Sequence, residues 1–157
     1  MSGAGAPEQG PIDGTGLNVV VIAGTWHDVI TDGLIAGAER VLTASGATHR
    51  LVRVPGSFEL AVAAQAAFAG GADAVVALGV IIRGGTPHFE YVSAATTDGL
   101  ARLALDTGKP VGFGVLTLDD EQQGIDRAGL PGSKEDKGAE AADAALRTAL
   151  VIRDLRG

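Results

Sequence analysis

Short apolar runs alternate with helix-like patterns along most of this 157-residue chain, and this alternation limits the fold more than any other feature. Two of the runs are almost continuously apolar, as in strands that are covered on both faces. Strands that alternate with helices are joined by right-handed crossovers, which build a parallel sheet with helices on its faces. The expected strands are Leu17–Ala23, Arg50–Val54, Ala74–Ile82 and Val111–Leu116. The sequence therefore predicts an α/β protein, a flavodoxin-like three-layer α/β/α sandwich with a four-stranded parallel sheet.

Periodic apolar positions predict helices between these strands and after the last one. In the first helix, apolar residues recur every three or four positions, and a glycine after its end supplies a stop signal. The predicted helices are Asp28–Ser45, a helix from the N-cap Ser57 to about Phe68, His88–Asp106, a short helix from a capping box at Thr117–Asp120 to about Ala128, and a last helix that opens with the pattern Ser133-x-x-Asp136.

The chain length fits one domain, because single domains typically hold about 100–200 residues. Residues 1–16 are rich in glycine and proline and show no periodicity, so we expect an extended N-terminal arm there. Residues 17–157 should then form the single domain. Aromatic residues make up 4% of the chain and glycine accounts for 24 positions, which predicts a core of small aliphatic side chains with closely packed backbones.

Charge and missing residue types exclude several classes of function. The net charge is −7 at pH 7, which disfavours nucleic-acid binding because phosphate backbones repel an acidic protein. The chain has no cysteine, so disulfides and thiolate chemistry are excluded. Residues 1–16 do not resemble a signal peptide, and no apolar run is long enough to span a membrane. We therefore expect a cytoplasmic protein without nucleic-acid or membrane partners.

Ligands of such parallel sheets bind outside the carboxyl ends of the strands. The four segments expected at that edge are Gly24–Asp28, Pro55–Glu59, Ile81–His88 and Phe113–Asp119. They contain neither a dinucleotide-binding fingerprint nor a phosphate-binding P-loop. The three histidines are far apart in the sequence and lack the spacing of metal ligands, so no metal site is predicted.

The strongest chemical signal follows the third expected strand. Gly84, Gly85 and Thr86 stand just before a predicted helix N-terminus, where backbone N–H groups can bind a phosphate. His88 lies within reach of a substrate held there, and the imidazole of histidine is a common general acid and base, which suits proton transfer. The alternative interpretation is a structural loop with a capping histidine.

Five further residues have both a functional and a structural interpretation. Trp26 could stack on a flat heterocycle, and Phe113 could form a ligand wall, although both residue types more often pack in cores. Glu59 could bind a ligand or favour the dipole of its helix. Arg127 could hold a phosphate or be a solvated charge, and Lys137 would by default belong to a surface ion pair.

Motifs spread over nearly the whole chain resemble those of the 6,7-dimethyl-8-ribityllumazine synthases, which catalyse the penultimate step of riboflavin biosynthesis. The resemblance extends from about residue 14 to residue 155. Its motifs are Val54–Glu59, Leu78–Val92, Phe113–Thr117, Glu121–Gly129 and Asp136–Gly138. Five matches in the same order and at similar spacing make this resemblance highly specific.

The resemblance implies an enzyme, a transferase that needs no cofactor. It would condense 5-amino-6-(D-ribitylamino)uracil with 3,4-dihydroxy-2-butanone 4-phosphate, giving 6,7-dimethyl-8-ribityllumazine, phosphate and water. His88 matches the proton-transfer residue of the family. The residues that match its ribitylaminouracil site are Trp26, Ser57, Phe58, Glu59, Val80, Ile81, Ile82, Phe113 and Lys137. Those that match its butanone phosphate site are Gly85, Thr86 and Arg127.

The resemblance also implies a homopentamer, with Phe113, Arg127 and Lys137 supplied by the neighbouring subunit, and a functional coupling to riboflavin synthase. The arm at residues 1–16 should add a strand or strap to the next subunit. The linker before Lys137 contains Pro131 and is longer than in shell-forming members, so no sixty-subunit shell is expected. The alternative function is a non-catalytic flavin- or lumazine-binding relative on the same fold, which would need neither His88 nor Arg127.

Overall fold

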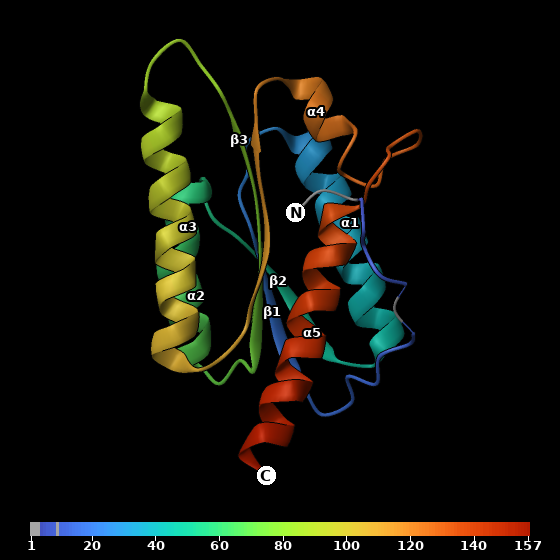
Figure 1. Cartoon of the computed structure of the whole chain (residues 1–157). Helices are drawn as coiled ribbons and strands as arrows, with labels where there is room; N and C mark the ends of the chain where they lie inside the picture. Colours follow the sequence, from blue (N-terminus) through green and yellow to red (C-terminus); the bar gives the residue numbers. More distant parts are fainter. Residues whose placement is uncertain (1–3, 9) are drawn as a thin grey trace.

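The computed structural model describes residues 4–8 and 10–157. Its centre is a sheet of four parallel strands in the order β2-β1-β3-β4 (Figure 1). The predicted parallel sheet is therefore confirmed, and one strand, β3, has the predicted bounds. The strands are β1 (Asn18–Ala23), β2 (Thr48–Arg53), β3 (Ala74–Ile82) and β4 (Val111–Leu118).

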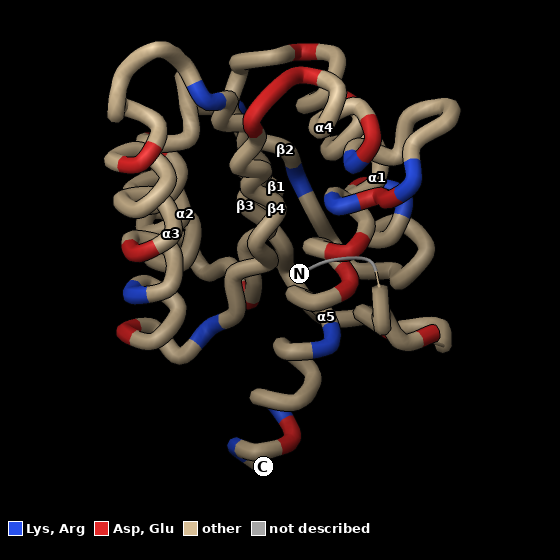
Figure 2. The backbone as a smooth tube through the Cα atoms, turned by 45° about the horizontal axis from the view of Figure 1, so that its top comes forward, with Lys and Arg blue, Asp and Glu red and all other residues tan. Residues whose placement is uncertain are grey.

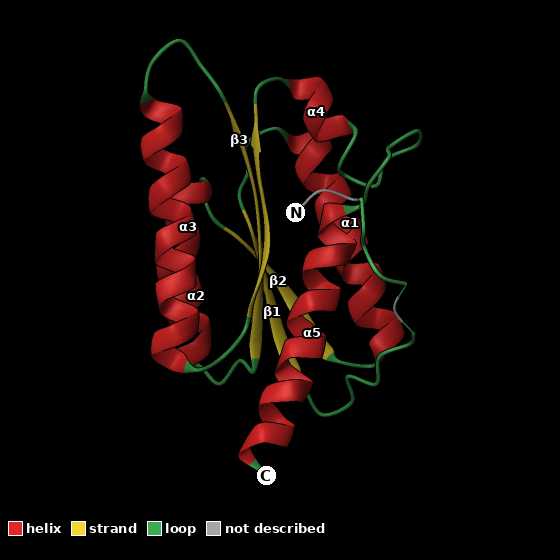
Figure 3. Cartoon of the chain, viewed as in Figure 1, coloured by secondary structure: helices red, strands yellow, loops and turns green. Residues whose placement is uncertain are grey.

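Helices cover both faces of the sheet and complete the three expected layers (Figure 3). One face carries α1 (Asp28–Ser45), α4 (Glu121–Ile125) and α5 (Lys137–Arg156). The other face carries the 3₁₀ turn η1 (Ser57–Glu59), α2 (Leu60–Ala69) and α3 (His88–Thr107). None of the helices in the described part of the chain has the length and hydropathy needed to cross a membrane.

The core consists of two layers of aliphatic side chains, one on each face of the sheet. Successive residues of β1 point to opposite faces, as in any strand. Val19 and Val21 pack with α1 and α5, whereas Val20 and Ile22 pack with α2 and α3. Among the described residues, Phe68 is the only buried aromatic side chain. The core is thus built from the small side chains that the composition predicts.

Glycines bring the backbone of α5 into direct contact with α1 and with β4. A Cβ atom on Gly138, in the first turn of α5, would lie 2.0 Å from the backbone oxygen of Leu34 in α1. A Cβ atom on Gly112 of β4 would lie 2.2 Å from the backbone oxygen of Ala141 in α5. Protein interiors are close-packed, so neither position leaves room for a side chain.

Several predicted element ends differ because the strand ladders extend further than the apolar runs. β2 begins at Thr48, where it pairs with the first residue of β1. β4 continues to Leu118, which pairs with the last residue of β3, so Thr117 lies in the strand and not in a capping box. Asp120 instead caps α4, because its carboxylate accepts a hydrogen bond from the Gln123 N–H (2.9 Å). The helix α4 ends at Ile125 and is shorter than predicted.

Both predicted serine caps are also wrong. Ser57 is not an N-cap residue: it lies inside a 3₁₀ turn whose N-cap is Gly56, and α2 begins at Leu60 with Glu59 as its N-cap. Ser133 bonds to the loop before α5, where its hydroxyl accepts from the Leu130 N–H (2.8 Å). Asp136 caps α5 by accepting from the Ala139 N–H (3.0 Å).

The described end of the arm lies against α1 and α5 of its own chain. The Gly14 N–H donates to the carbonyl of Ser45 at the end of α1 (2.8 Å), and Ile12 packs against the core layer beside α1. Arg147 of α5 donates to the Gly10 carbonyl. Residues 1–3 and 9 lie outside the described residues. The arm boundary and the strap to a neighbouring subunit stay predictions.

We expect Gly138→Ala to destabilise the protein by about 2–3 kcal/mol, because the added methyl group overlaps the Leu34 backbone. Helix propensity alone predicts the opposite sign, since alanine is about 1 kcal/mol more favourable than glycine inside a helix. Gly84→Ala is the matched control, because a Cβ atom there would meet no atom within 4 Å. Urea denaturation of both variants measures the difference, and a stabilised Gly138→Ala protein would contradict the close packing.

Candidate active site

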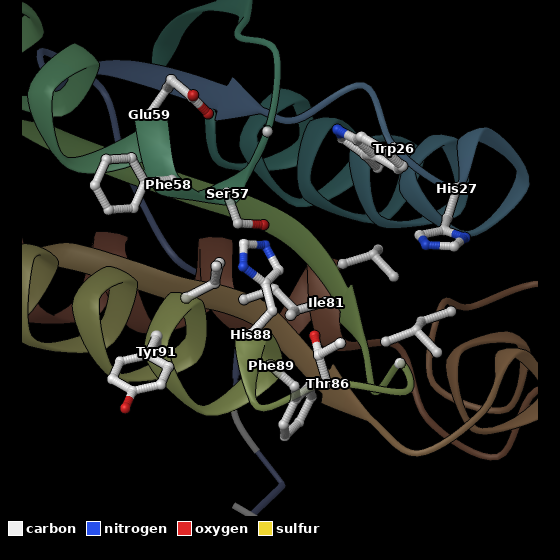
Figure 4. Close-up of a pocket in the computed structure, with 15 residues that line it drawn as sticks. Trp26, His27, Ser57, Phe58, Glu59, Ile81, Thr86, His88, Phe89 and Tyr91 are labelled. Atoms are coloured by element: carbon white, nitrogen blue, oxygen red, sulfur yellow. The ribbon is translucent and has the colours of Figure 1, made fainter.

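A cleft of about 710 Å³ opens at the carboxyl ends of the strands, where the sequence predicted a ligand site (Figure 4). Three segments form it: the β1–α1 turn, the β2–α2 turn, and the β3–α3 loop with the first turns of α3. This volume lies within the range of small-molecule sites, about 300–1,000 Å³. The residues of its wall are Trp26, His27, Gly56, Ser57, Phe58, Glu59, Val80, Ile81, Ile82, Gly84, Thr86, His88, Phe89, Tyr91 and Val92.

The β1–α1 turn holds Trp26 at the mouth of the cleft. The Arg53 guanidinium donates to the Gly24 carbonyl (2.8 Å), and the Thr31 hydroxyl donates to the Trp26 carbonyl (2.7 Å). These bonds fix the backbone on both sides of the indole. The Trp26 side chain is nevertheless 67% exposed, which excludes the core-packing interpretation.

The β2–α2 turn places Ser57 directly against β3. Ser57 is 8% exposed, and a Cβ atom on Gly79 in β3 would lie 2.4 Å from its hydroxyl oxygen. Any side chain at Gly79 would therefore push Ser57 out of its place. The Thr25 hydroxyl donates to the Pro55 carbonyl (2.7 Å) and ties this turn to the β1–α1 turn. Phe58 projects outward with 65% of its surface exposed.

The end of β3 leads from the floor of the cleft into an open loop. Val80 and Ile81 are buried, whereas Gly84 and Thr86 line the cleft beyond them. A Cβ atom on Gly84 or on Gly85 would meet nothing within 4 Å, so the backbone groups of this loop are accessible. Gly85 lies between two wall residues but is not itself part of the wall.

His88 is the first residue of α3 and lies across the cleft from the β2–α2 turn. Figure 4 shows the His88 ring and the Ser57 hydroxyl pointing toward one another. Phe89 follows and is partly buried against the core layer beside α2. An imidazole and a hydroxyl group thus face the same space beside the accessible loop backbone.

Four of the six aromatic side chains are exposed, which is unusual for residues of this size. Tyr91 is 75% exposed and Phe113 is 46% exposed, in addition to Trp26 and Phe58. Trp26, Phe58 and Tyr91 line the cleft. Exposed aromatic groups that cluster around a cavity indicate a binding surface for ligands or for another protein chain.

The cleft wall carries little positive charge. Glu59 is its only acidic residue, and no lysine or arginine of the described chain lines it. Beside the cleft, the Arg83 guanidinium contacts Glu90 and Asp119. These hydrogen bonds, the one to Glu90 first, raise the pKa of Arg83, and the Arg83 bond holds the pKa of Glu90 below its usual value.

Three predicted site residues, Arg127, Lys137 and Phe113, lie outside this cleft. Basic and acidic residues stand close together around α4 and the start of α5 (Figure 2). There Arg127 Nε lies 3.8 Å and Lys137 Nζ lies 3.6 Å from the carboxylate of Glu135. Lys137 therefore belongs to an ion-pair cluster, as its default interpretation predicted. Phe113 is on the edge strand β4.

Sequence reasoning missed several residues of the cleft wall. His27 is the clearest case: it precedes α1 in the left-handed conformation (φ 55°), which non-glycine residues rarely adopt. The wall residues to which the sequence assigned no role are His27, Gly56, Phe89, Tyr91 and Val92. All of them stand beside residues that the motifs singled out, but spacing alone does not say which neighbours of a motif face a cavity.

The fold and the cleft define an α/β protein with a cavity of small-molecule size at the carboxyl edge of a parallel sheet. The chain belongs to the 6,7-dimethyl-8-ribityllumazine synthase family, whose model matches residues 16–153. The 6,7-dimethyl-8-ribityllumazine synthase of Leifsonia xyli subsp. xyli is 75% identical, with both chains covered completely. That of Clavibacter sepedonicus is 70% identical over all of this chain and 99% of the relative. That of Nocardioides sp. is 61% identical over 99% of this chain and 97% of the relative. The family resemblance predicted from the motifs is confirmed.

Proposed function

We propose that the cleft at the carboxyl edge of the sheet is where the reaction of this enzyme family takes place. The chain is a transferase that condenses 5-amino-6-(D-ribitylamino)uracil with 3,4-dihydroxy-2-butanone 4-phosphate. The products are 6,7-dimethyl-8-ribityllumazine, phosphate and water, and the step is the penultimate one of riboflavin biosynthesis. The observation that carries the proposal is that Trp26, Ser57 and His88 converge on one cleft beside an accessible glycine loop.

The pyrimidine substrate would occupy the part of the cleft between the β1–α1 turn and the end of β3. The exposed indole of Trp26 offers a flat face for stacking. Backbone groups of Val80–Ile82 can hold the uracil edge. The ribityl chain would lie along Ser57, Phe58 and Glu59, where the Glu59 carboxylate can accept hydrogen bonds from its hydroxyl groups.

The butanone phosphate would bind at the β3–α3 loop. Gly85 and Thr86 stand before the N-terminus of the twenty-residue helix α3, and the N–H groups of such a terminus favour an anion. A phosphate dianion also requires a cation, and the cleft wall of a single chain has no lysine or arginine among its described residues. Arg127 of a neighbouring subunit would supply it, since a guanidinium offers a planar fork to phosphate oxygens.

The chemistry requires proton transfers and no redox step. An amine attacks the ketone, phosphate leaves, and the second amine closes the ring. His88 would shuttle the protons, because an imidazole changes its charge near neutral pH. Holding both substrates in one cleft removes much of the entropic barrier, which can be worth about 7–11 kcal/mol. We therefore propose that the enzyme works without a cofactor. The cytoplasmic location and the coupling to riboflavin synthase remain predictions.

The working unit in this proposal is a homopentamer with sites between adjacent subunits. Phe113, Arg127 and Lys137 lie outside the cleft of their own chain, so a site that uses them needs a second copy. Exposed apolar groups also occur on both edge strands, with Leu51 on β2 and Phe113 on β4. A contact between opposite edges is head-to-tail, and a head-to-tail contact that closes makes a ring.

Mixing the wild-type protein with both substrates should produce lumazine absorbance.

The His88→Ala variant should lower kcat by about 100-fold with little change in either KM, because a general acid–base group contributes about 10²–10⁴-fold. His49→Ala is the matched control, since His49 lies on β2 and not in the cleft. An unchanged kcat in folded His88→Ala protein would refute its catalytic role. Lumazine binding without turnover by the wild type would favour the non-catalytic alternative.

Arg127→Ala should raise KM for the butanone phosphate by about 10- to 100-fold, because a hydrogen bond to a charged group contributes roughly 1.5–3 kcal/mol. The KM for the pyrimidine should change little. The control is Arg102→Ala, on the exposed surface of α3, where Arg102 makes only an i,i+4 ion pair with Asp106. Steady-state kinetics with each substrate varied in turn gives both constants. Equal increases in the two KM values would show that Arg127 is structural.

Light scattering should give the mass of five chains, and co-expression tests whether their sites are shared. In hybrid rings of His88→Ala and Arg127→Ala chains, about one site in four pairs an intact His88 with an intact Arg127 from its neighbour. With the butanone phosphate kept well below the raised KM of Arg127→Ala, activity near a quarter of the wild-type value is therefore expected, well above either variant alone. A mass of one or two chains, or a hybrid no more active than the parents, would contradict the shared site. A mass near sixty chains would contradict only the prediction that the longer linker with Pro131 prevents a sixty-subunit shell.

A further inference from the structure

Arg83 makes three side-chain contacts at the base of the β3–α3 loop. Its Nη1 lies 2.5 Å from a carboxylate oxygen of Glu90 in the first turn of α3. Its Nε lies 3.1 Å from the carboxylate of Asp119, just after β4. The guanidinium carbon lies 4.3 Å from the centre of the Phe89 ring. One side chain thus joins α3, the end of β4 and a residue of the cleft wall.

The Arg83–Glu90 ion pair joins the two ends of the loop that carries the proposed phosphate site. Arg83 and Glu90 are seven residues apart, and the segment between them contains Gly84, Gly85, Thr86 and His88. Two consecutive glycines give this segment wide conformational freedom, since neither Cβ position meets another group. The backbone anchor at its start is the bond from the Arg83 N–H to the Leu118 carbonyl (2.8 Å). The side chain of Arg83 provides the anchor at the other end.

We propose that Arg83 is a positioning residue for the phosphorylated substrate. It holds the Gly84–Thr86 backbone and His88 in their binding geometry, and it does not contact the phosphate itself. Two carboxylates and an aromatic ring occupy its guanidinium, and Arg83 is not part of the cleft wall. This inference rests on the proposed function of the loop.

Arg83→Met tests the proposal, because methionine keeps much of the aliphatic stem and loses the ion pairs. If the unclamped loop is competent to bind for about a tenth of the time, KM for the butanone phosphate rises about tenfold. The inhibition constant of inorganic phosphate should rise by the same factor, and KM for the pyrimidine should stay within about twofold. Arg102→Met, which removes another arginine ion pair of α3, should change none of these constants.

Glu90→Gln separates positioning from direct binding. If Arg83 clamps the loop, removing the Glu90 charge weakens the clamp and raises the inhibition constant of inorganic phosphate. The double variant with Arg83→Met should then be no worse than Arg83→Met alone, because both changes break the same contact. Arg83→Lys should restore part of the affinity, since lysine keeps the charge but not the fork or the stacking. A lower inhibition constant in Glu90→Gln would show that a freed Arg83 binds phosphate directly, and it would overturn the proposal.

Thr86→Ala distinguishes failure of this inference from failure of the proposed site. Weaker phosphate binding in Thr86→Ala with an unchanged constant in Arg83→Met would leave the site standing and refute the role of Arg83. Unchanged constants in both variants would refute the phosphate site, and with it the inference. Equal increases of both KM values in Arg83→Met, with a lower Tm, would show a general structural role and also overturn the positioning role.

Discussion

The direct backbone contact of α5 with α1 and β4 is the constraint on which the rest of the structure depends. Gly138 and Gly112 permit it, because any larger residue would hold the elements apart. The contact fixes the start of α5, where Asp136 caps the helix and pairs with Arg40 of α1 at 2.5 Å. The preceding segment, with Arg127, is fixed with it. Arg127 and Lys137, the two cations of the proposed shared site, therefore lie on the face of the sheet opposite to α3.

Glycine has opposite effects at two places in the structure, the first turn of α5 and the β3–α3 loop. At Gly138 it removes a side chain so that backbones can touch, and the result is rigid. At Gly84 and Gly85 it leaves the backbone bare toward open space, and the result is a loop that needs external support. Arg83 lies where such support is required: it pairs with Glu90 and Asp119, neither of which lines the cleft, and it stacks on Phe89 of the cleft wall. The proposed phosphate site therefore has its support from an exposed ion pair and needs no buried charge.

The layers of the fold could be predicted from the sequence because the apolar period of each segment is a local property. The bounds of β3 and α1 agree with the prediction, since each begins and ends at a clear change of pattern. The prediction of helix N-caps failed where more than one nearby polar residue could cap the same helix. Thr117 and Ser133 both fit a helix cap. Thr117 instead pairs with β3 as a residue of strand β4, and the Ser133 hydroxyl accepts a hydrogen bond from Leu130 in the loop before α5.

The sequence by itself determined the types of chemistry present: an imidazole, a glycine loop before a helix, and family motifs over nearly the whole chain. It also determined the edge of the sheet at which they meet, because parallel strands end together. Only the tertiary structure decided that Trp26 is exposed, that Ser57 packs on Gly79, and that Arg127 and Lys137 lie away from His88. The reason is physical: spacing along a chain fixes local periodicity, whereas the distance between segments depends on how closely their backbones can pack.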